Sequence, residues 1–268
     1  MSTLDDAPTE ASVPERQRPI LGHPTPSTQD FLPHSSGEEL PGKLIVIEGG
    51  DGSGRSTQIR LLHEWLEWTG FAVQTMGLRR SRLMGKDLKE LAQRNELQRT
   101  TNVLLYATDF YDQIENRITP ALRAGFVVLA DRYTLTLMCR ARVRGLTEDY
   151  LNGIFAYVPE PALRLMLDVP PEEAFDRFFA AKQQIDHWEC GGDLNLASNL
   201  YESFITYQRD LRHHFDTEVK RKGYRVVDGA RSVADVNEDL RGEIGEVLGI
   251  QDLHYTPSDK LQGLFQKR

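Results

Sequence analysis

Cysteine is scarce in this sequence, with only Cys139 and Cys190 among 268 residues. Their spacing fits neither a metal-binding motif nor a disulfide framework, so both are expected to be buried thiols in a reducing compartment. No apolar run approaches the roughly 20 residues that a membrane span requires. The N-terminus also has no basic-then-apolar signal pattern. We therefore expect a cytoplasmic protein that contacts no membrane.

Positive charge is also in deficit. The chain has 32 Lys and Arg against 40 Asp and Glu, a net charge of −8, which argues against a nucleic acid polymer as partner. The charge is not uniform, because basic residues gather between Arg79 and Arg99. A local basic patch on an acidic chain suits a small anionic ligand, although its later members also fit a solvated helix face.

Apolar residues are sparse in residues 1–40, which hold six of the 13 prolines. Such a composition buries too little apolar surface to offset the entropy of folding, so residues 1–40 are predicted to be a disordered, proline-rich tail. One large folded domain of residues 41–250 is expected to follow, because this length suffices for a single core. Residues 251–268 are expected to form a C-terminal tail of uncertain order.

What the chain does contain is a regular alternation of apolar strands and helical segments. Because the strands are apolar enough to be buried on both faces, we predict a parallel sheet. The predicted fold class is an α/β three-layer sandwich, with a five-stranded parallel sheet flanked by helices. Residues 181–199 lack clear periodicity and are predicted to form a lid. The expected strands are residues 43–48, 71–76, 126–130, 163–168 and 224–228.

A glycine-rich turn follows the first strand. Gly49 to Ser56 has the spacing of a P-loop, G-x-x-x-x-G-K-[ST], between an apolar run and a helix. In such a loop, backbone N–H groups and a helix N-terminus bind phosphate, which predicts ATP as the ligand. The Ser56 hydroxyl is expected to bind Mg²⁺. The predicted nucleotide-binding residues are Gly49, Gly50, Asp51, Gly52, Ser53, Gly54, Arg55, Ser56 and Thr57.

One position departs from the P-loop pattern, because Arg55 stands where lysine is usual. Arginine keeps the positive charge that neutralises a transferred phosphoryl group, but its planar fork is longer and cannot simply take the place of a lysine. Either the enzyme works with a rearranged phosphate clamp, or nucleotide binding survives without catalysis. On the first reading Arg55 is a catalytic residue.

Polar residues also follow the second and third strands. Asp131-Arg132-Tyr133 closes the third strand, and a basic turn from Gly77 to Arg82 closes the second. Ligands in open α/β sheets sit outside the carboxyl ends of the strands, so these clusters and the P-loop should meet. Asp131 is predicted to hold Mg²⁺ or orient the acceptor, and Arg132 to clamp phosphate oxygens, both as catalytic residues. An internal Asp131–Arg132 ion pair is the alternative.

Asp51 lies among the loop glycines, where a carboxylate near phosphates is unfavourable unless it faces a hydroxyl or a cation of a second substrate. An Asx turn is the alternative. Tyr106 and Phe110 lie four residues apart on one helix face and could flank a base, although core packing is at least as good an explanation of Phe110. The acids of the predicted lid are expected to be solvated rather than a metal cluster: Asp186, Glu189 and Asp193.

Three stretches together resemble thymidylate kinases, a family of P-loop nucleoside monophosphate kinases. They are IEGGDGSGRSTQ (47–58), the segment from LLYATD to ITPALRAGFVVLADRY (104–133), and PEPALRLMLDVPPEEAFDRF (159–178). The resemblance spans about residues 44–248 and is weakest in the lid and the tails. It implies ATP, Mg²⁺, transfer of the γ-phosphoryl to a nucleoside monophosphate such as dTMP, and a homodimer.

The family's residue roles carry over at matching positions. The resemblance implies that Asp51 contacts the sugar hydroxyl of the acceptor and that Tyr106 stacks on thymine. Ser56 and Thr57 match magnesium and phosphate residues, and the Asp131-Arg132 pair matches one near the phosphates. The expected substrate-binding residues are Asp51, Arg79, Arg80, Arg82, Tyr106, Phe110 and Arg132.

The chain departs from the family at several places. Arg55 replaces the P-loop lysine, and Phe110 stands where the family has a base-reading arginine, which removes a hydrogen bond to thymine O4. The turn from Leu78 to Arg82 holds several arginines, so the acceptor-phosphate residue is not unique, and the lid has no arginine. Two alternatives stay open: a nucleotide-binding protein with little or no kinase turnover, and a kinase for a nucleoside or other small acceptor.

Overall fold

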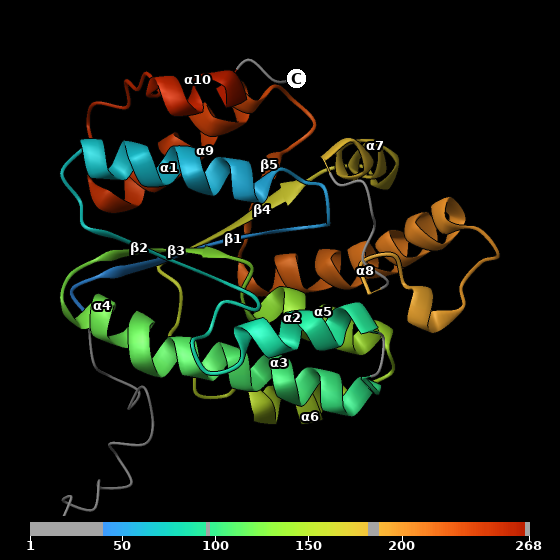
Figure 1. Ribbon diagram of the computed structural model, residues 1–268. Helices are drawn as coiled ribbons and strands as arrows, with labels where there is room; N and C mark the ends of the chain where they lie inside the picture. The colour runs from blue at the N-terminus through green and yellow to red at the C-terminus, as the bar shows by residue number, and fades with distance from the viewer. Residues whose placement is uncertain (1–39, 95–96, 182–187, 266–268) are drawn as a thin grey trace, which may run out of the picture. The chain divides into compact units, whose positions relative to one another are not determined.

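The structure, a computed structural model, describes residues 40–94, 97–181 and 188–265 (Figure 1). The predicted tail of residues 1–40 therefore lies outside the described residues apart from Leu40, and so do residues 182–187 of the predicted lid. Within the described ranges, no helix is both long and apolar enough to cross a bilayer.

The strands form one parallel sheet in the order β2-β3-β1-β4-β5. This confirms the predicted five-stranded parallel sheet. The chain passes from β3 on one side of β1 to β4 on the other, so the carboxyl end of β1 is the switch point at which such sheets bind ligands. The strands are β1 (Lys43–Gly49), β2 (Val73–Gly77), β3 (Val127–Asp131), β4 (Leu163–Asp168) and β5 (Arg225–Asp228).

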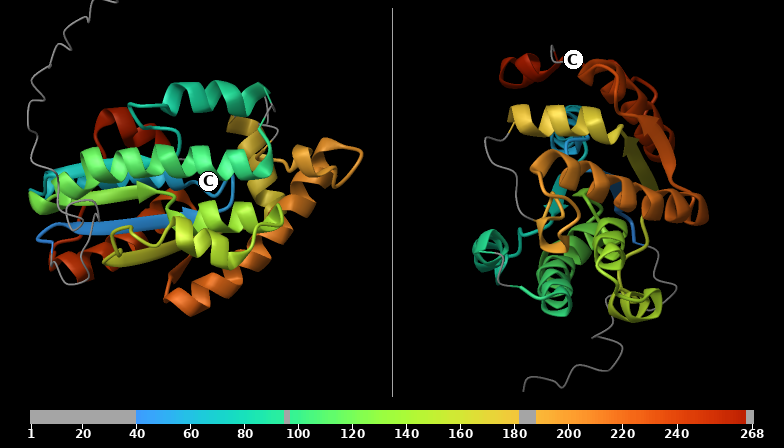
Figure 2. Two further views of the ribbon diagram at one scale, coloured as in Figure 1. Left: turned by 90° about the horizontal axis from the view of Figure 1, so that it is seen from below. Right: turned by 90° about the vertical axis from the view of Figure 1, so that its right-hand side faces the viewer.

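Helices cover both faces of the sheet (Figure 1). α1, α9 and α10 lie over one face, and α3, α5, α6 and α8 lie under the other. Seen from below in Figure 2, α3 and α5 run under the strands, with α8 on the far side of α5. Their bounds are α1 (Arg55–Trp68), α2 (Gly85–Arg94), α3 (Arg99–Gln113), α5 (Thr134–Val143), α6 (Glu148–Ile154), α7 (Pro171–Ala181), α8 (Leu200–Lys222), α9 (Val233–Leu248) and α10 (Asp259–Phe265).

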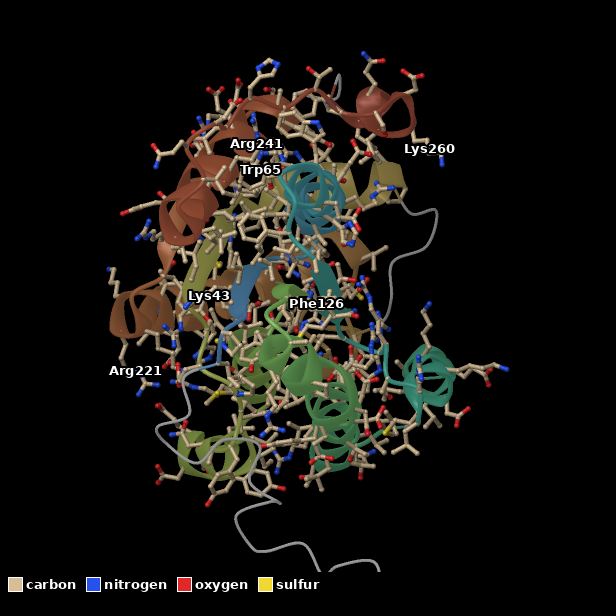
Figure 3. All side chains as sticks on the ribbon, turned by 90° about the vertical axis from the view of Figure 1, so that its left-hand side faces the viewer. Lys43, Trp65, Phe126, Arg221, Arg241 and Lys260 are labelled. Atoms are coloured by element: carbon tan, nitrogen blue, oxygen red, sulfur yellow. The ribbon has the colours of Figure 1, made fainter. Side chains whose placement is uncertain are left out.

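The central strand supplies both cores. Alternate side chains of β1 point to opposite faces, so Leu44 and Val46 pack with α3, α5 and α8, while Ile45 and Ile47 pack with α1 and α9. Trp65 of α1 is fully buried in the second core, and Figure 3 shows it between α1 and its neighbours above the sheet. This two-sided burial explains why β1 is apolar throughout its length.

Residues 99–123 are helical throughout but not uniformly α-helical. α3 continues into a π-helical turn, η1 (Ile114–Ile118), and then into α4 (Thr119–Arg123). Pro120 lacks a backbone N–H and cannot continue the regular hydrogen-bond ladder, and the π turn lies immediately before it.

The segment that follows α9 packs on the fold rather than leaving it as a tail. Glu64 of α1 accepts hydrogen bonds from Tyr255 Oη and Ser258 N, both at 2.7 Å. The Tyr255 ring is buried against the α1–α9 core, and α10 follows with Phe265 at its edge. The sequence did not anticipate this order because the anchoring contacts reach back almost to the start of the domain.

Candidate active site

The polar clusters at the ends of β1, β2 and β3 meet around one cavity of about 620 Å³. The P-loop lines it from Asp51 to Thr57, and Arg79 and Arg80 line it from the turn after β2. Asp131 and Arg132 face it from the end of β3. The convergence expected from the sheet topology is therefore present in the fold.

The P-loop has the backbone shape that phosphate binding requires. Gly52 has φ 82°, and a Cβ there would meet the Ala174 carbonyl oxygen at 2.2 Å, so only glycine fits. Gly54 precedes α1 in the left-handed conformation, with φ 88°. Among the described residues, no acceptor pairs with the backbone N–H of Arg55 or Ser56 at the start of α1. Groups of this kind at a helix N-terminus are suited to bind an anion.

Arg55 folds back onto its own loop. Its Nη1 donates to the carbonyl oxygens of Gly49 and Gly50 and, at 2.8 Å, to Ser53 Oγ. Its Nε donates to Asp131 Oδ1 at 3.1 Å. The guanidinium therefore ties the P-loop to the end of β3 while its charge stays in the cavity lining. A lysine, which has one nitrogen, could not make all of these contacts at once.

Ser56 and Asp131 present two oxygens side by side. Ser56 Oγ donates to Asp131 Oδ2 at 2.7 Å, and both residues line the cavity. Burial alone would raise the pKa of Asp131, but the charge of Arg55 and the Ser56 hydrogen bond outweigh it and lower that pKa. A hydroxyl beside an ionised carboxylate suits Mg²⁺, which prefers hard oxygen ligands and keeps several waters or phosphate oxygens.

Asp51 is the most heavily paired carboxylate in the cavity wall. It accepts from Arg132 Nη2 at 2.5 Å, from Arg140 Nη2 at 2.9 and 2.8 Å, and from Gln208 Nε2 at 3.1 Å. Burial would raise its pKa, but the charges of Arg132 and Arg140 hold the pKa well below the usual range of an aspartate. A third charge, that of Arg55, acts in the same direction. Asp51 thus stays ionised among guanidinium groups.

Arg132 has a backbone that few arginines adopt, with φ 75°. Glu48 at the end of β1 stabilises the turn, because its carboxylate accepts from Tyr133 N at 2.8 Å and Thr136 N at 3.2 Å. Burial and the nearby charge of Arg55 lower the pKa of Arg132 to about 10. The Arg132 side chain lies at the P-loop, because its Nη2 donates to Asp51 and its Nη1 donates to the Gly49 carbonyl at 3.3 Å. It does not form the internal hydrogen-bonded pair with Asp131 that was the alternative.

The arginine turn after β2 is held by α3. Asp109 is fully buried and accepts from the backbone N–H groups of Arg79, at 2.8 Å, and Ser81, at 2.9 Å. Arg79 reaches within 3.8 Å of Glu189, and Arg80 within 3.6 Å of Asp131. Arg82 is exposed and does not line the cavity. The structure thus brings Arg79 and Arg80 to the site and leaves Arg82 outside it.

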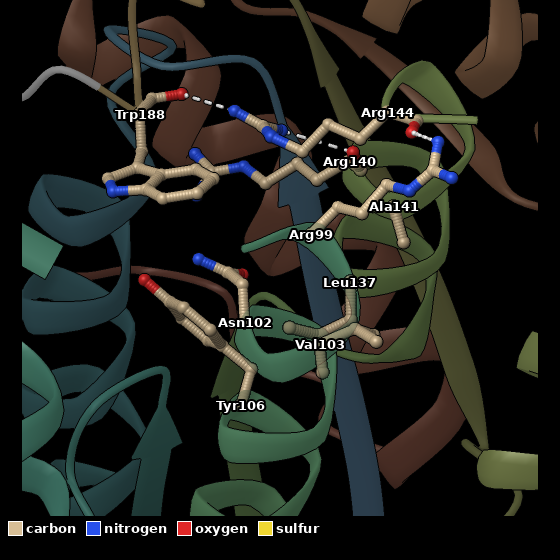
Figure 4. A pocket seen from close by; sticks show the side chains of 9 residues that line it. All are labelled: Arg99, Asn102, Val103, Tyr106, Leu137, Arg140, Ala141, Arg144 and Trp188. Atoms are coloured by element: carbon tan, nitrogen blue, oxygen red, sulfur yellow. Dashed lines mark hydrogen bonds between the residues drawn. The ribbon is translucent and has the colours of Figure 1, made fainter. Parts of the chain in front are cut away.

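A smaller pocket, which we call the α3–α5 slot, opens beside the main cavity (Figure 4). Tyr106 and Arg140 line both spaces. Phe110 lines neither, because its ring is fully buried against Tyr133 and Phe155, with ring centroids 4.9 and 5.9 Å away. The expectation that Phe110 flanks a base is therefore wrong, and core packing explains it. The slot is lined by Arg99, Asn102, Val103, Tyr106, Leu137, Arg140, Ala141, Arg144 and Trp188.

The two lid acids that the structure describes, Glu189 and Asp193, are not solvated, contrary to expectation. Glu189 is 6% exposed and lines the main cavity, and Asp193 binds Arg144 through both carboxylate oxygens, at 2.8 and 2.9 Å. Asp186 lies outside the described residues. Within the described part of the chain, no group of three or more His, Cys, Asp or Glu side chains is placed to hold a metal ion.

Several site residues escaped the sequence analysis. Arg140 has no motif around it, although it lies two turns after the Asp131-Arg132 pair. Arg177 of α7 donates to the Gly229 and Ala230 carbonyls, at 2.7 and 3.0 Å, and so joins α7 to the loop after β5. The sequence held only a partial indication of Arg140 and Arg177, namely that both occupy helical positions near the carboxyl ends of the strands.

Comparisons with known proteins agree with this geometry. The sequence model of the family described as thymidylate kinase matches residues 47–240. A probable thymidylate kinase 2 of Saccharolobus solfataricus is 35% identical over 78% of this chain and 98% of its own length. A probable thymidylate kinase of Pyrococcus abyssi is 30% identical over 79% and 100% of the two chains, and a thymidylate kinase of Desulfotalea psychrophila is 30% identical over 78% and 96%. The resemblance seen in the sequence is confirmed, and the chain belongs to the thymidylate kinase family.

Proposed function

We propose that this protein transfers the γ-phosphoryl group of ATP to dTMP. The observation that carries the proposal is that the P-loop, the arginine turn and Tyr106 line one cavity, and that the N–H groups of Arg55 and Ser56 have no acceptor among the described residues. The names of the relatives, which are thymidylate kinases, support the choice of acceptor. We call the P-loop half of the cavity, with Arg177 and Gly229, the donor side, and the half from Arg79 to the α3–α5 slot the acceptor side.

On the donor side, the triphosphate of ATP lies on the N-terminus of α1. The N–H groups of Arg55 and Ser56 point at its oxygens, and the helix dipole adds to the attraction. The adenine end extends toward Arg177 and Gly229, which line the same cavity. Catalysis of this kind consists mainly of positioning and electrostatic stabilisation.

Mg²⁺ would be held by Ser56 Oγ and, directly or through water, by Asp131. When bound, it would supply positive charge that offsets the negative charge developing on the donor phosphates. Asp131 contributes its lowered pKa, which keeps the carboxylate ionised at neutral pH. Ser56 contributes a hydroxyl that Asp131 already orients.

On the acceptor side, Arg79 and Arg80 bind the 5′-phosphate, and Tyr106 stacks on the base. Asp51, fixed by Arg132 and Arg140, faces the sugar between them. A phosphate oxygen of the acceptor forms a bond to the γ-phosphorus while the bond from that phosphorus to the β–γ bridging oxygen breaks. The products are ADP and the nucleoside diphosphate. Arg132 stabilises charge on the transferred group.

Arg55 contributes by holding the loop and by its charge. Its contacts with Gly49, Gly50 and Asp131 shape the P-loop without the lysine of the usual motif. This supports the reading of a working enzyme with a rearranged clamp. The alternative is nucleotide binding without turnover, and Arg55 variants separate the two.

We also propose that the protein is a homodimer in a reducing cytoplasm. The family resemblance supports the dimer, and the two free, buried thiols of Cys139 and Cys190 support the compartment. Light scattering coupled to size-exclusion chromatography tests the dimer, and a monomer at micromolar concentration would exclude it.

A coupled assay of ADP formation tests the activity. The full chain with Mg²⁺ and ATP is presented with dTMP, dUMP, dCMP, AMP, GMP and thymidine. We expect dTMP to give the highest kcat/KM. Arg55→Ala should lower kcat/KM by about 100-fold, whereas Arg55→Lys, which keeps the charge, should stay within about tenfold of wild type.

The outcomes distinguish the candidates. Acceptor-dependent ADP formation from thymidine but not from dTMP would favour a nucleoside kinase. ATP binding measured by calorimetry, without turnover in wild type or in Arg55→Lys, would favour a nucleotide-binding protein. Either result would overturn the proposed function.

A further inference from the structure

The α3–α5 slot contains polar groups that the proposed function leaves without a role. Arg140 Nε is buried and has no hydrogen-bond acceptor among the described residues. Asn102 lines the slot, and within the described part of the chain its carboxamide forms no hydrogen bond. A buried donor without an acceptor is costly, and a ligand oxygen would satisfy it.

The helix spacing places these groups on the side of Tyr106 opposite to Phe110. The slot residues of α3 are Arg99, Asn102, Val103 and Tyr106, which follow the i, i+3, i+4, i+7 pattern of one helix face. Phe110 lies one turn further along and is packed in the core. Among the side chains of α3, those that can make polar contacts to a base stacked on Tyr106 therefore lie in its N-terminal turns.

The shape of the slot determines what enters it. Figure 4 shows Trp188 and the Arg140 side chain on one side and Tyr106, Asn102 and Val103 on the other. The slot volume, about 30 Å³, is small beside the main cavity, so only the edge of one ring fits inside. A base that enters past Tyr106 and Arg140 brings its far edge to Asn102.

We propose that Asn102 reads this edge of the acceptor base and selects keto over amino pyrimidines. The inference rests on the proposed function and names the specificity-determining residue of its acceptor site. The carboxamide offers a donor and an acceptor, which match O4 and N3–H of thymine. A flipped amide would match cytosine instead, but the donors of Arg99 and Arg140 attract Asn102 Oδ1 and so fix the orientation in which Nδ2–H faces the base, where it pairs with a carbonyl oxygen and not with an amino group.

Arg99 and Arg140 line the slot beside Asn102 and can only donate hydrogen bonds. They attract a carbonyl oxygen and repel the amino group that cytosine carries at the same position. Arg140 remains in place because its Nη2 is held by Asp51, which leaves Nε for the ligand. The slot therefore has a surplus of donors, which favours thymine and uracil.

The test measures kcat/KM for dTMP and dCMP at saturating ATP in Asn102→Ala and Asn102→Asp. Asn102→Ala should lower the dTMP/dCMP ratio by about 10- to 100-fold. Asn102→Asp, which only accepts hydrogen bonds, should lower it further. The KM for ATP should not change. Asn152→Ala and Asn152→Asp on exposed positions of α6 are matched controls and should keep the wild-type ratio.

Each outcome decides the matter. A wild type that phosphorylates dTMP, with Asn102 variants of unchanged ratio, overturns the inference and leaves the proposed function intact. Equal losses for dTMP and dCMP in Asn102→Ala, at an unchanged melting temperature, also overturn it. If wild type forms no ADP with any acceptor, the proposed function fails. In that case, calorimetric Kd values for dTMP and dCMP test the inference. It is overturned if wild type does not bind dTMP more tightly than dCMP, or if Asn102→Ala keeps that preference.

Discussion

The donor side of the cavity is built largely from backbone, whereas the acceptor side is built from side chains. The P-loop presents N–H groups over a short stretch, Gly49 to Thr57, between β1 and α1. The acceptor side combines the turn after β2 with faces of α3 and α5 and with Trp188. A backbone site depends on a local glycine pattern, while a side-chain site depends on which helix faces meet.

The two sides are joined by Asp51. Its carboxylate belongs to the P-loop, but its partners Arg132 and Arg140 lie at the start of α5 and in the wall of the slot. These ion pairs link the two sides of the cavity, so a change of charge on one side alters the electrostatic environment of the other. If backbone N–H groups do most of the phosphate binding, as proposed, the donor side depends less on which cation stands at position 55.

The largest expected effect is on the acceptor side and follows from Phe110→Arg. Restoring the family's arginine at a fully buried position places a charge against Tyr133 and Phe155. We expect the free energy of unfolding to fall by at least about 4 kcal/mol, or the cooperative fold to be lost. Urea unfolding followed by circular dichroism measures it.

Phe110→Leu serves as the control, because it keeps the site apolar and should cost less than about 3 kcal/mol. A Phe110→Arg protein that unfolds like wild type and binds dTMP more tightly would contradict this expectation. It would show that the arginine at position 110 leaves the core and reaches the acceptor side.

The next effect concerns the donor side. Asp131→Ala removes the partner of Arg55 Nε and of the Ser56 hydroxyl. We expect kcat/KM to fall by about 1,000-fold, since a catalytic carboxylate near the phosphates is lost. The coupled assay, run as a Mg²⁺ titration, should show a shifted Mg²⁺ requirement in any residual activity.

Asp149→Ala on the exposed surface of α6 controls for general effects of losing a carboxylate. Binding of dTMP to Asp131→Ala should remain measurable by calorimetry. If Asp131→Ala lost dTMP affinity but kept ATP affinity, Asp131 would belong to the acceptor side instead.

Sequence reasoning reached the fold and the donor side because both rest on local patterns. The strands read as apolar runs, and the P-loop as a fixed spacing of glycines from Gly49 to Gly54. The convergence of Asp131 with the loop followed from the rule that ligands bind at strand ends. The contacts of Arg55 with the loop carbonyl oxygens, however, could not be predicted from the sequence. They depend on the three-dimensional path of the loop rather than on its composition.

The acceptor side resisted prediction for a physical reason. Whether Phe110 or Asn102 faces a ligand depends on the rotation of α3 against α5, and apolar periodicity fixes that only approximately. Trp188 joins the slot because Arg144 holds its carbonyl, at 3.1 Å, through a contact between residues far apart in sequence. Asp193 was read as a solvated acid because its partner lies on another helix.

A smaller effect on stability is expected from changing Asp51, whose ion pairs link the donor side to the acceptor side. Asp51→Asn leaves Arg132 and Arg140 buried without their counter-charge, and we expect a loss of about 3 kcal/mol at pH 7. The lowered pKa of Asp51 means that its stabilising effect is fully present above the ordinary aspartate pKa of about 4. It is lost as the pH falls below that value toward the lowered one.

The stability difference between wild type and Asp51→Asn should therefore be constant from about pH 5 to 8 and shrink below about pH 4. Urea unfolding at a series of pH values measures it. A difference that grows on acidification would show that Asp51 is not held ionised by its arginines.

The smallest effect separates the two sides most cleanly. Asp193 binds Arg144 with both carboxylate oxygens, and the Arg144 guanidinium lies 4.9 Å from the centre of the Trp188 ring, so the pair holds one wall of the slot. Asp193→Asn keeps one acceptor oxygen but removes the negative charge, which should weaken the interaction with Arg144 by about 1 kcal/mol. We expect the KM for dTMP to rise by about fivefold, with kcat and the KM for ATP unchanged.

Glu160→Gln is the control. It removes an ion pair with Arg164 in which the Glu160 side chain is 84% exposed, and it should change neither KM value. A rise in the KM for ATP with Asp193→Asn would show that Trp188 and its support serve the donor side as well, and that the two halves are not independent.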